Sequence, residues 1–389
     1  MKRFLATVTI VFGVILIGLS YASYALLGNW GVTLPRHIDN VDAFMDNRRA
    51  ETGVPGLAVG VLNKDGLQWD GYYGTSDGAA PVTDETIFMV ASVSKTVVGT
   101  AVMQLWEQGE FDLDDNINDY LSFEVQNPHQ PNELITFRHL MIHRSTIIDR
   151  EPLYDDMYTL ENGGDSEWGM AEFLEAYFTP NGEFYSADNF LQTTPNSQFE
   201  YSNYGNALLA VLVEEISGEP FSQYAQNHIF EPLGMTSSYF LLSDIPADVD
   251  TATPFLEGEA IPQYNFPDYP SGSLRTNIND LSKFAAFYLD PAGHDSGLLE
   301  PETVAIMFGE YGESADLGEG EMGLVWVHMD SLLLNAIGHT GGDYGVSAYI
   351  MLYPDDEYAT LMMQNGNSSS VFIERSILKR LKEEGAKLN

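Results

Sequence analysis

The chain has 389 residues, of which 44% are hydrophobic, so it is long and apolar enough for one large folded domain or two smaller ones. It carries 57 acidic against 17 basic residues, and a polyanion with a formal net charge of −40 repels phosphate backbones, which excludes a nucleic-acid partner. The absence of cysteine excludes disulfides, thiolate metal sites and a cysteine nucleophile.

The N-terminus has the pattern of an export signal. A basic Met-Lys-Arg start precedes an apolar run from Phe4 to about Leu27. The run is also long enough to span a bilayer, so residues 1–27 are interpreted as either a cleaved signal peptide or a retained membrane anchor. A buried N-terminal helix is disfavoured because no polar face interrupts the run. In both favoured cases residues 28–389 lie outside the cytoplasm, periplasmic or secreted, and only the N-terminal segment contacts a membrane.

A helix, a hairpin and a second helix are predicted in the first part of the body. The first helix runs from Arg36 to about Glu51. Two strands, Gly56–Asn63 and Leu67–Gly74, then flank a short turn. The second helix extends from about Ser92 to Gln108.

The start of this second helix carries the first candidate for chemistry, the sequence Ser92-Val93-Ser94-Lys95. Three residues along a helix place Ser92 and Lys95 on one face. A serine at a helix start has free backbone N–H groups beside it, which can hold a developing oxyanion. Lys95 can take the hydroxyl proton if burial or a neighbouring charge lowers its pKa. An S-x-x-K spacing often arises by chance, but Lys95 lies on an otherwise apolar helix, where a solvated lysine would be out of place.

The middle of the chain alternates helices with long polar loops. The clearest helices are Trp168–Phe178, Asn203–Ile216 and Ile278–Leu289. No lysine or arginine occurs from Glu151 to Leu274. This acidic stretch indicates either a solvated surface suited to salty water or a surface that disfavours anionic substrates.

The second candidate is Tyr201-Ser202-Asn203, just before an apolar helix. A phenol beside an ammonium group can become a proton acceptor, because the cation favours the phenolate. Asn203 can hydrogen-bond a substrate carbonyl or orient Lys95. The alternative for this motif is a simple helix cap.

Strand patterns return near the C-terminus, followed by a helix that starts near Ser370. The third candidate, His339-Thr340-Gly341-Gly342, comes at the end of one of these strands. Glycines there let a substrate approach the backbone, and one backbone N–H can complete an oxyanion hole with that of Ser92. The alternative is an ordinary Gly-Gly turn. The predicted late strands are Gly323–His328, Leu332–Gly338, Gly345–Tyr353 and Tyr358–Gln364.

This order of elements predicts an α+β fold. Two strands come early and several late, so one antiparallel sheet is expected from both chain ends, with terminal helices covering it. The sheet part comprises about residues 36–75 and 320–389, and a helical lobe is inserted at about residues 76–319. A cleft between the two parts is a usual place for a ligand site.

The ordered set S-x-x-K, Y-x-N and H-T-G resembles the serine beta-lactamase and penicillin-binding protein superfamily, in particular its class C-like branch of family VIII esterases, D-aminopeptidases and DD-peptidase-like proteins. The resemblance covers roughly Asp42 to Leu381 and includes the blocks TIFMVASVSKT, FEYSNYGNALLAVLVEEISG and SGSLRTNINDLSKFA. It implies the beta-lactamase/transpeptidase-like fold, which agrees with the architecture expected from the elements.

The resemblance also implies roles for individual residues. Ser92 would be the acylated nucleophile, and Lys95 would be its proton partner. Tyr201 would be the general base and would pass the proton to the leaving group. Asn203 would position the substrate.

In the third motif, His339 takes the place of the lysine found in the K-T-G motif of many relatives. Thr340 and Gly341 would contact substrate, and the backbone N–H groups of Gly342 and Ser92 would form the oxyanion hole. A neutral histidine is a weaker partner for a drug carboxylate than a lysine, which argues against efficient beta-lactam hydrolysis.

One further block of the chain departs from the family pattern. Where relatives often read H-T-S-G-L, this chain has the sequence His143 to Ile147, HRSTI, so the nearby loop is expected to differ. Arg275 is a candidate to compensate for the missing lysine, and the alternative is a surface or loop-packing role. His139 and His143 are spaced like zinc ligands, but Leu140 occupies the glutamate position of H-E-x-x-H, so packing or hydrogen-bonding roles are favoured and no metal is expected.

The sequence therefore predicts a metal- and cofactor-independent serine hydrolase that cleaves an ester or amide in a small molecule or peptide through an acyl-enzyme on Ser92. The alternatives are a peptidase for D-amino-acid termini, including a DD-carboxypeptidase, or a weak beta-lactamase. A different class remains open, a non-catalytic ligand-binding or structural member of the fold. The oligomeric state is left open.

Overall fold

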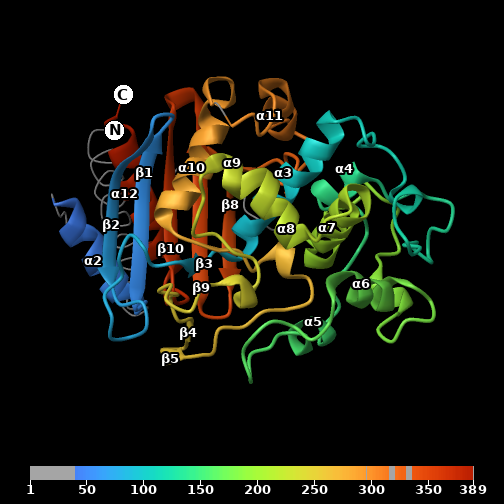
Figure 1. The fold of residues 1–389 in the computed structure, drawn as a ribbon, viewed down its shortest axis with the longest axis horizontal. Helices are drawn as coiled ribbons and strands as arrows, with labels where there is room; N and C mark the ends of the chain where they lie inside the picture. The colour runs from blue at the N-terminus through green and yellow to red at the C-terminus, as the bar shows by residue number, and fades with distance from the viewer. Residues whose placement is uncertain (1–39, 295, 315–319, 330–334, 389) are drawn as a thin grey trace, which may run out of the picture. The chain divides into compact units, whose positions relative to one another are not determined.

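The fold is built on a six-stranded antiparallel sheet with strand order β2-β1-β10-β9-β8-β7 (Figure 1). The computed structural model describes residues 40–294, 296–314, 320–329 and 335–388. Two short pairs, β3 with β6 and β4 with β5, complete the strands of these ranges. The strands are β1 (Gly56–Asn63), β2 (Gly66–Gly74), β3 (Phe88–Met89), β4 (Phe255–Leu256), β5 (Glu259–Ala260), β6 (Arg275–Thr276), β7 (Val327–Met329), β8 (Ala336–Asp343), β9 (Val346–Tyr353) and β10 (Tyr358–Gln364).

Both chain ends contribute to this sheet, which confirms the predicted fold class. The early hairpin β1–β2 joins the late strands because β1 pairs with β10, from Leu57 opposite Gln364 to Asn63 opposite Tyr358. The central strands β1, β9 and β10 are almost entirely buried, which explains their nearly continuous apolar sequences. The edge strand β2 is only partly buried and alternates polar with apolar residues.

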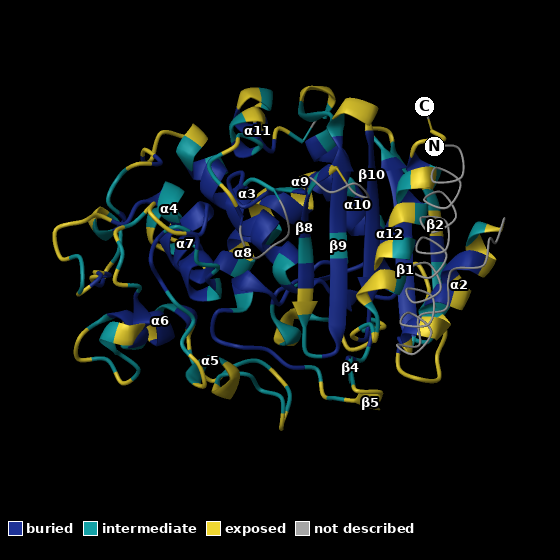
Figure 2. Cartoon of the chain, turned by 180° about the vertical axis from the view of Figure 1, so that it is seen from behind, coloured by how far each residue is buried: buried dark blue, intermediate teal, exposed yellow. Residues whose placement is uncertain are grey.

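Helices cover both faces of the sheet. Helix α10 packs on β1, β2, β9 and β10, whereas α12 packs on β1 and β10 from the opposite side, as the front and back views show (Figures 1 and 2). The helices are α2 (Val41–Thr52), α3 (Ser94–Glu107), α4 (Phe137–Met141), α5 (Leu153–Asp156), α6 (Met170–Phe178), α7 (Asn203–Ser217), α8 (Phe221–Ala225), α9 (Glu231–Leu233), α10 (Ile278–Leu289), α11 (Pro301–Met307) and α12 (Val371–Gly385).

The predicted helices are recovered with small shifts at the ends that the structure describes, whereas the expected start at Arg36 lies outside the described residues. One helix lies in an unexpected place. α10 belongs by sequence to the stretch expected to form the helical lobe, yet it lies on the sheet. Its apolar residues alternate with the period of an amphipathic helix, and the sheet face supplies the surface that buries them. Of the other inserted helices, α3, α4, α6 and α8 pack against α7 (Figure 1).

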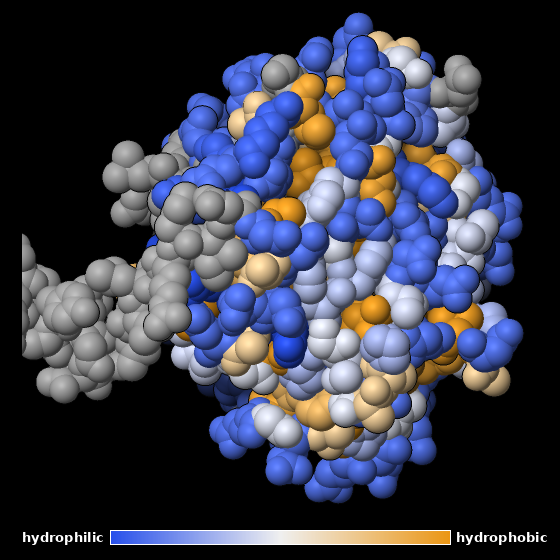
Figure 3. Space-filling model, turned by 90° about the vertical axis from the view of Figure 1, so that its left-hand side faces the viewer, coloured by the Kyte–Doolittle hydropathy of each residue, from blue (hydrophilic) through white to orange (hydrophobic). Residues whose placement is uncertain are grey.

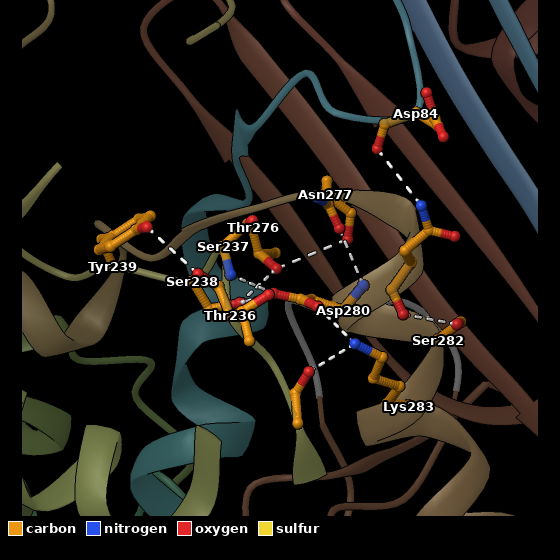
Figure 4. Close-up of polar contacts among 12 residues, drawn as sticks. Asp84, Thr236, Ser237, Ser238, Tyr239, Thr276, Asn277, Asp280, Ser282 and Lys283 are labelled. Carbon is orange, nitrogen blue, oxygen red and sulfur yellow. Dashed lines mark hydrogen bonds and ion pairs between the residues drawn. The ribbon is translucent and has the colours of Figure 1, made fainter. Parts of the chain in front are cut away.

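A polar network at the start of α10 fixes the strand that precedes it (Figure 4). Asn277 caps the helix by accepting a hydrogen bond from Asp280 N at 2.9 Å. The Asp280 carboxylate in turn accepts from Ser237 N at 2.6 Å and Ser238 Oγ at 3.1 Å, and it pairs with Lys283 at 2.9 Å. The loop after α9 is thereby tied to the start of α10, which directly follows β6. β6 pairs with β3, the strand that leads to the Ser92 motif.

The N-terminal predictions fall largely on residues that the structure does not describe. The expected signal or anchor at residues 1–27, and the boundary that follows it, lie outside the described ranges. No helix among residues 40–388, apart from the gaps named above, is long and apolar enough to cross a membrane. The face at the β2 edge of the sheet is mostly hydrophilic (Figure 3), as a solvated polar surface requires.

Candidate active site

The candidate nucleophile Ser92 lies in a 3-10 turn, Ala91–Val93, that leads directly into α3. The predicted helix start is thus correct, but its first turn is tighter than an α-helix. Ala91 has a φ of +45°, in the left-handed region that a residue with a side chain rarely adopts. Ser94 holds this turn, because its hydroxyl donates to Ala91 O at 2.6 Å and accepts from Leu274 N at 3.0 Å.

Lys95 joins the motifs into one cluster. Its side chain is 0% exposed, and Nζ lies 3.0 Å from Ser92 Oγ. Nζ also donates to Asn203 Oδ1 at 2.7 Å and to Ser271 O at 2.5 Å. These three contacts use the full donor capacity of an ammonium group and aim the amine at the serine hydroxyl.

Burial controls the protonation of this amine. The loss of water around Lys95 lowers its pKa to about 7, although the negative charges of Asp268, Asp149 and Asp343 act in the opposite direction. A lysine with this pKa is partly neutral at physiological pH, and its neutral form can accept a proton from a hydroxyl. The sequence predicts that Lys95 needs a lowered pKa to act as a proton acceptor, and burial in the structure lowers it.

Tyr201 lies beside the same amine, with its ring centroid 5.1 Å from Lys95 Nζ. Burial raises the pKa of the Tyr201 phenol, although a hydrogen bond with Ser92 acts in the opposite direction. The sequence predicts a lowered phenol pKa, because a neighbouring ammonium group favours the phenolate. The pKa is raised instead, because the loss of water around the phenolate outweighs its attraction to a lysine that is itself partly neutral. The phenol is therefore protonated at neutral pH.

Asn203 is the first residue of α7, and Ser202 is its N-cap, with its hydroxyl accepting from Gly205 N at 2.9 Å. The helix-cap alternative and the site interpretation of the Tyr-Ser-Asn motif thus describe the same turn. The capped turn places the Asn203 side chain against Lys95 Nζ. Tyr201, the residue before the cap, lines the pocket.

One carboxylate that the sequence reasoning missed organises this turn. Asp149 accepts four hydrogen bonds, from Ser202 Oγ at 2.7 Å, Asn203 N at 2.6 Å, Asn203 Nδ2 at 3.0 Å and Tyr204 N at 3.1 Å. Burial raises the pKa of its carboxyl, and these bonds act in the opposite direction. An acidic residue at a helix N-terminus is also favoured by the helix dipole. The only signal in the sequence was the place of Asp149 just after the altered HRSTI block.

His143, within that block, packs on the site. Its Nδ1 accepts a hydrogen bond from Ser202 N at 3.2 Å, and its ring centroid lies 4.3 Å from that of Tyr201. It does not share a helix face with His139, as the i, i+4 spacing suggested, because α4 ends at Met141 and His143 has a φ of +53°. No group of three or more histidine or acidic side chains in the described ranges is placed to hold a metal ion.

The third motif lies inside a strand rather than after one. β8 continues through His339 to Asp343 because β9 pairs along its whole length, with Gly341 opposite Ala348 and Gly342 opposite Ser347. A Cβ on Gly341 would lie 2.2 Å from Val90 O, so only glycine lets β8 pass this close to the nucleophile turn.

His339 is a buried residue of β8, and its Nδ1 contacts Thr340 O at 2.6 Å. Burial, with a smaller effect from Lys95, lowers its pKa to about 3, so the imidazole is neutral at physiological pH. Arg275 does not replace the missing positive charge. It is 0% exposed, and its guanidinium donates to the carbonyl oxygens of Ser273 and Tyr264. These contacts agree with the loop-packing role, the alternative predicted from the sequence.

A pocket of about 430 Å³ opens at the nucleophile. Of the eight predicted site residues, Ser92, Tyr201, Asn203 and Gly342 line it. The other four are not among the lining residues, but each is within three residues of one in the sequence. They are Lys95, which follows Ser92, and His339, Thr340 and Gly341, which precede Gly342. The other lining residues are Tyr154, Asp155, Tyr158, Leu256, Phe266, Ser271, Gly272, Asp343, Tyr344 and Asn367.

Residues 41–383 match the family model described as Beta-lactamase. The chain belongs to the Beta-lactamase family. The predicted resemblance to serine beta-lactamases and penicillin-binding proteins is thereby confirmed, and members of this family are generally serine hydrolases.

Individual members of the family are distant relatives. The chain is 23% identical over 340 residues to Protein flp of Staphylococcus aureus (strain COL), covering 85% of this chain and 64% of that protein. It therefore spans somewhat less than two thirds of the length of this relative.

Two solved structures share the fold. The octameric penicillin-binding protein homologue from Pyrococcus abyssi has a TM-score of 0.70 and 22% identity, covering 89% of this chain and 78% of that one. D-alanine carboxypeptidase AmpC from Burkholderia cenocepacia has a TM-score of 0.65 and 18% identity, covering 88% and 97%.

The four hydrogen bonds to Asp149 make a testable prediction. Asp149→Ala should lower kcat/KM for an ester substrate by about 10- to 100-fold, because Asn203 and the start of α7 lose the acceptor that positions them. Removing the acceptor from buried donors should also cost about 1–3 kcal/mol of unfolding free energy. Steady-state kinetics and thermal unfolding measure the two effects.

Asp65→Ala, in the exposed turn between β1 and β2, is the matched control and should change neither quantity. To separate positioning from stability, Asp149→Glu should recover stability better than activity, because a longer side chain keeps the charge at the helix start but shifts Asn203. An Asp149→Ala enzyme with full turnover would contradict the positioning role.

Proposed function

We propose that the protein is a serine hydrolase that cleaves a carboxylic ester or amide through an acyl-enzyme on Ser92. The observation that carries the proposal is the 3.0 Å contact between Lys95 Nζ and Ser92 Oγ inside a buried cluster that opens into a pocket. A lysine with a pKa of about 7 has the properties of a general base for this hydroxyl.

In the acylation step, neutral Lys95 takes the hydroxyl proton as Ser92 Oγ forms a bond to the substrate carbonyl carbon. The carbonyl π electrons move to its oxygen, and the backbone N–H groups of Ser92 and Gly342 stabilise the resulting negative charge. When the carbonyl re-forms, the bond to the leaving group breaks with its electron pair. Tyr201 donates its proton to the leaving group and regains one from the Lys95 ammonium.

In deacylation a water molecule attacks the ester on Ser92. It gives one proton to the site, the carboxylic acid leaves, and the proton returns to Ser92 Oγ. The protonated state of the Tyr201 phenol supports this relay role in place of the general-base role that the family resemblance implied. Lys95 is then the base.

The charge of the pocket favours esters and neutral amides over beta-lactams. Asp155 and Asp343 line it, and no lysine or arginine is among the lining residues of the described chain. A beta-lactam carboxylate would meet these acidic groups without a cationic partner, and juxtaposed like charges weaken binding. A peptidase for D-amino-acid termini is the second candidate, supported by the shared fold of the D-alanine carboxypeptidase.

We also propose that the body is extracytoplasmic, because a basic start precedes the apolar N-terminal run. A small-molecule or peptide substrate is the partner that the pocket favours.

A serine-reactive fluorophosphonate followed by peptide mass mapping tests the nucleophile. We expect the label on the peptide that contains Ser92. We also expect kcat/KM for p-nitrophenyl acetate to exceed that for nitrocefin by about tenfold or more, since like-charge repulsion affects only the beta-lactam. A label on another serine would overturn the assignment of the nucleophile, and the reverse substrate ranking would overturn the preference for esters. If the protein neither reacts with the fluorophosphonate nor hydrolyses either substrate, the non-catalytic alternative is favoured over the hydrolase.

A further inference from the structure

Aromatic rings form much of the wall around the nucleophile. Four of the residues that line the 430 Å³ pocket are aromatic in addition to Tyr201, and three of them come from the acidic stretch without lysine or arginine. Tyr158 connects them, with ring centroids 5.5 Å from Tyr154, 4.7 Å from Phe266 and 5.3 Å from Tyr344. These contacts hold the rings in place around the cavity.

One carboxylate lies among these rings. Asp343, the last residue of β8, lines the pocket directly after Gly342. Its Oδ1 accepts from Tyr344 N at 2.7 Å, and its Oδ2 accepts from Tyr158 Oη at 3.3 Å. Phenol and amide donors orient the carboxylate but do not neutralise it, and in the described chain no ion pair involves Asp343.

The surroundings strengthen this negative potential. Asp155 stands at the same pocket and accepts from Tyr344 Oη at 2.8 Å. The nearest buried amine, that of Lys95, is held at Ser92 and Asn203 rather than at the carboxylate. Arg275 donates to backbone carbonyls outside the pocket. The pocket therefore joins several aromatic rings with a carboxylate that makes no ion pair in the described chain, although the charge of Lys95 attracts it from a greater distance.

We propose that this pocket binds a compact alkylammonium group of the substrate, with Asp343 as its counter-ion and the rings of Tyr154, Tyr158 and Tyr344 as its walls. The face of an aromatic ring attracts a cation, and this attraction is stronger when water is excluded. A carboxylate in the same pocket adds a full charge at short range. The inference rests on the proposed function, because it assumes that the ammonium group belongs to a substrate whose scissile carbonyl lies at Ser92.

Calorimetric binding to the full-length Ser92→Ala variant tests the site without requiring turnover. The probes are choline and 3,3-dimethylbutan-1-ol, which have nearly the same shape but differ in charge. The measurement is made at pH 8, above the pKa of about 6 to which burial raises the Asp343 carboxyl. About 0.5 M NaCl screens the attraction of the acidic surface for any cation.

We expect choline to bind about tenfold or more tightly than the alcohol, and Asp343→Asn in the same background to bring the two within about twofold. Asp65→Asn removes one charge at the opposite end of the sheet and should leave the preference intact. Tyr344→Leu should weaken choline binding through loss of one wall. Equal binding of the two probes, or a preference that survives Asp343→Asn, would overturn the proposal.

Hydrolysis of acetylcholine and 3,3-dimethylbutyl acetate by the unmodified protein separates this inference from the proposed function. A choline preference in binding without hydrolysis of either ester would retain the cation site and reject the hydrolase. Hydrolysis of both esters at equal kcat/KM, with no binding preference, would retain the hydrolase and reject the cation site.

Discussion

Replacing Ser92 by alanine should lower kcat/KM for p-nitrophenyl acetate by about 10⁴-fold or more. Ser92 is the hydroxyl that contacts Lys95 Nζ, and it faces the pocket, so its removal leaves no group to form the acyl-enzyme. The residual rate should come only from binding and backbone N–H groups, which act without a nucleophile. Steady-state kinetics with the purified variant measures the loss.

Ser369→Ala, an exposed serine after β10, is the matched control and should retain full activity. The Ser92→Ala variant should unfold at a temperature close to that of the unmodified protein, because it removes one partly exposed hydroxyl. If this folded variant kept more than a tenth of the activity, the acyl-enzyme mechanism would be wrong.

Lys95→Met should lower kcat/KM by about 10²- to 10⁴-fold, the range that general-base catalysis usually contributes. Methionine suits this test because it is unbranched and fills the buried space on the apolar face of α3, while it removes the amine. Ser271 O and Asn203 Oδ1 lose their donor, so thermal unfolding must be measured alongside the kinetics to show that the variant is folded.

The pH dependence distinguishes a base from a structural lysine. In the unmodified protein kcat/KM should rise as pH increases through about 7, because the neutral form of Lys95 accepts the proton and its pKa is lowered to about 7. In Lys95→Met the residual activity should lose this rise. Lys64→Met, an exposed lysine in the β1–β2 turn, should keep it. A rise near pH 7 that persists in Lys95→Met would assign the titration to another group.

Much of the fold could be predicted because its signals are local. The apolar runs of β1, β9 and β10 and the helical period of α7 and α10 appear directly in the sequence. The location of α10 could not be predicted in the same way, since its apolar face indicates burial but not the partner that buries it. β8 was predicted to end at Gly338 because glycines often end strands, whereas here it continues to Asp343 because β9 pairs along them.

The candidate site shows the same division. The motifs of Ser92, Tyr201 and His339 have recognisable spacing, and the structure brings their chain segments together. Asp149 has no motif of its own, because its role depends on the helix end that it meets 53 residues later in the sequence. The sign of the Tyr201 pKa shift depends on burial, which spacing does not reveal. The aromatic wall combines Tyr154 of α5 with loop residues, and only tertiary packing places them side by side.

The pairing of β1 with β10 affects how the protein is made. Ribosomal synthesis releases the β1–β2 hairpin roughly 300 residues before β10, which at about 5–20 residues per second is a delay of about 15–60 s. During that time one edge of β1 has no partner, and an unpaired apolar edge invites association with other nascent chains. We therefore expect yield during overexpression to depend on chaperones that shield this hairpin until the C-terminal strands emerge.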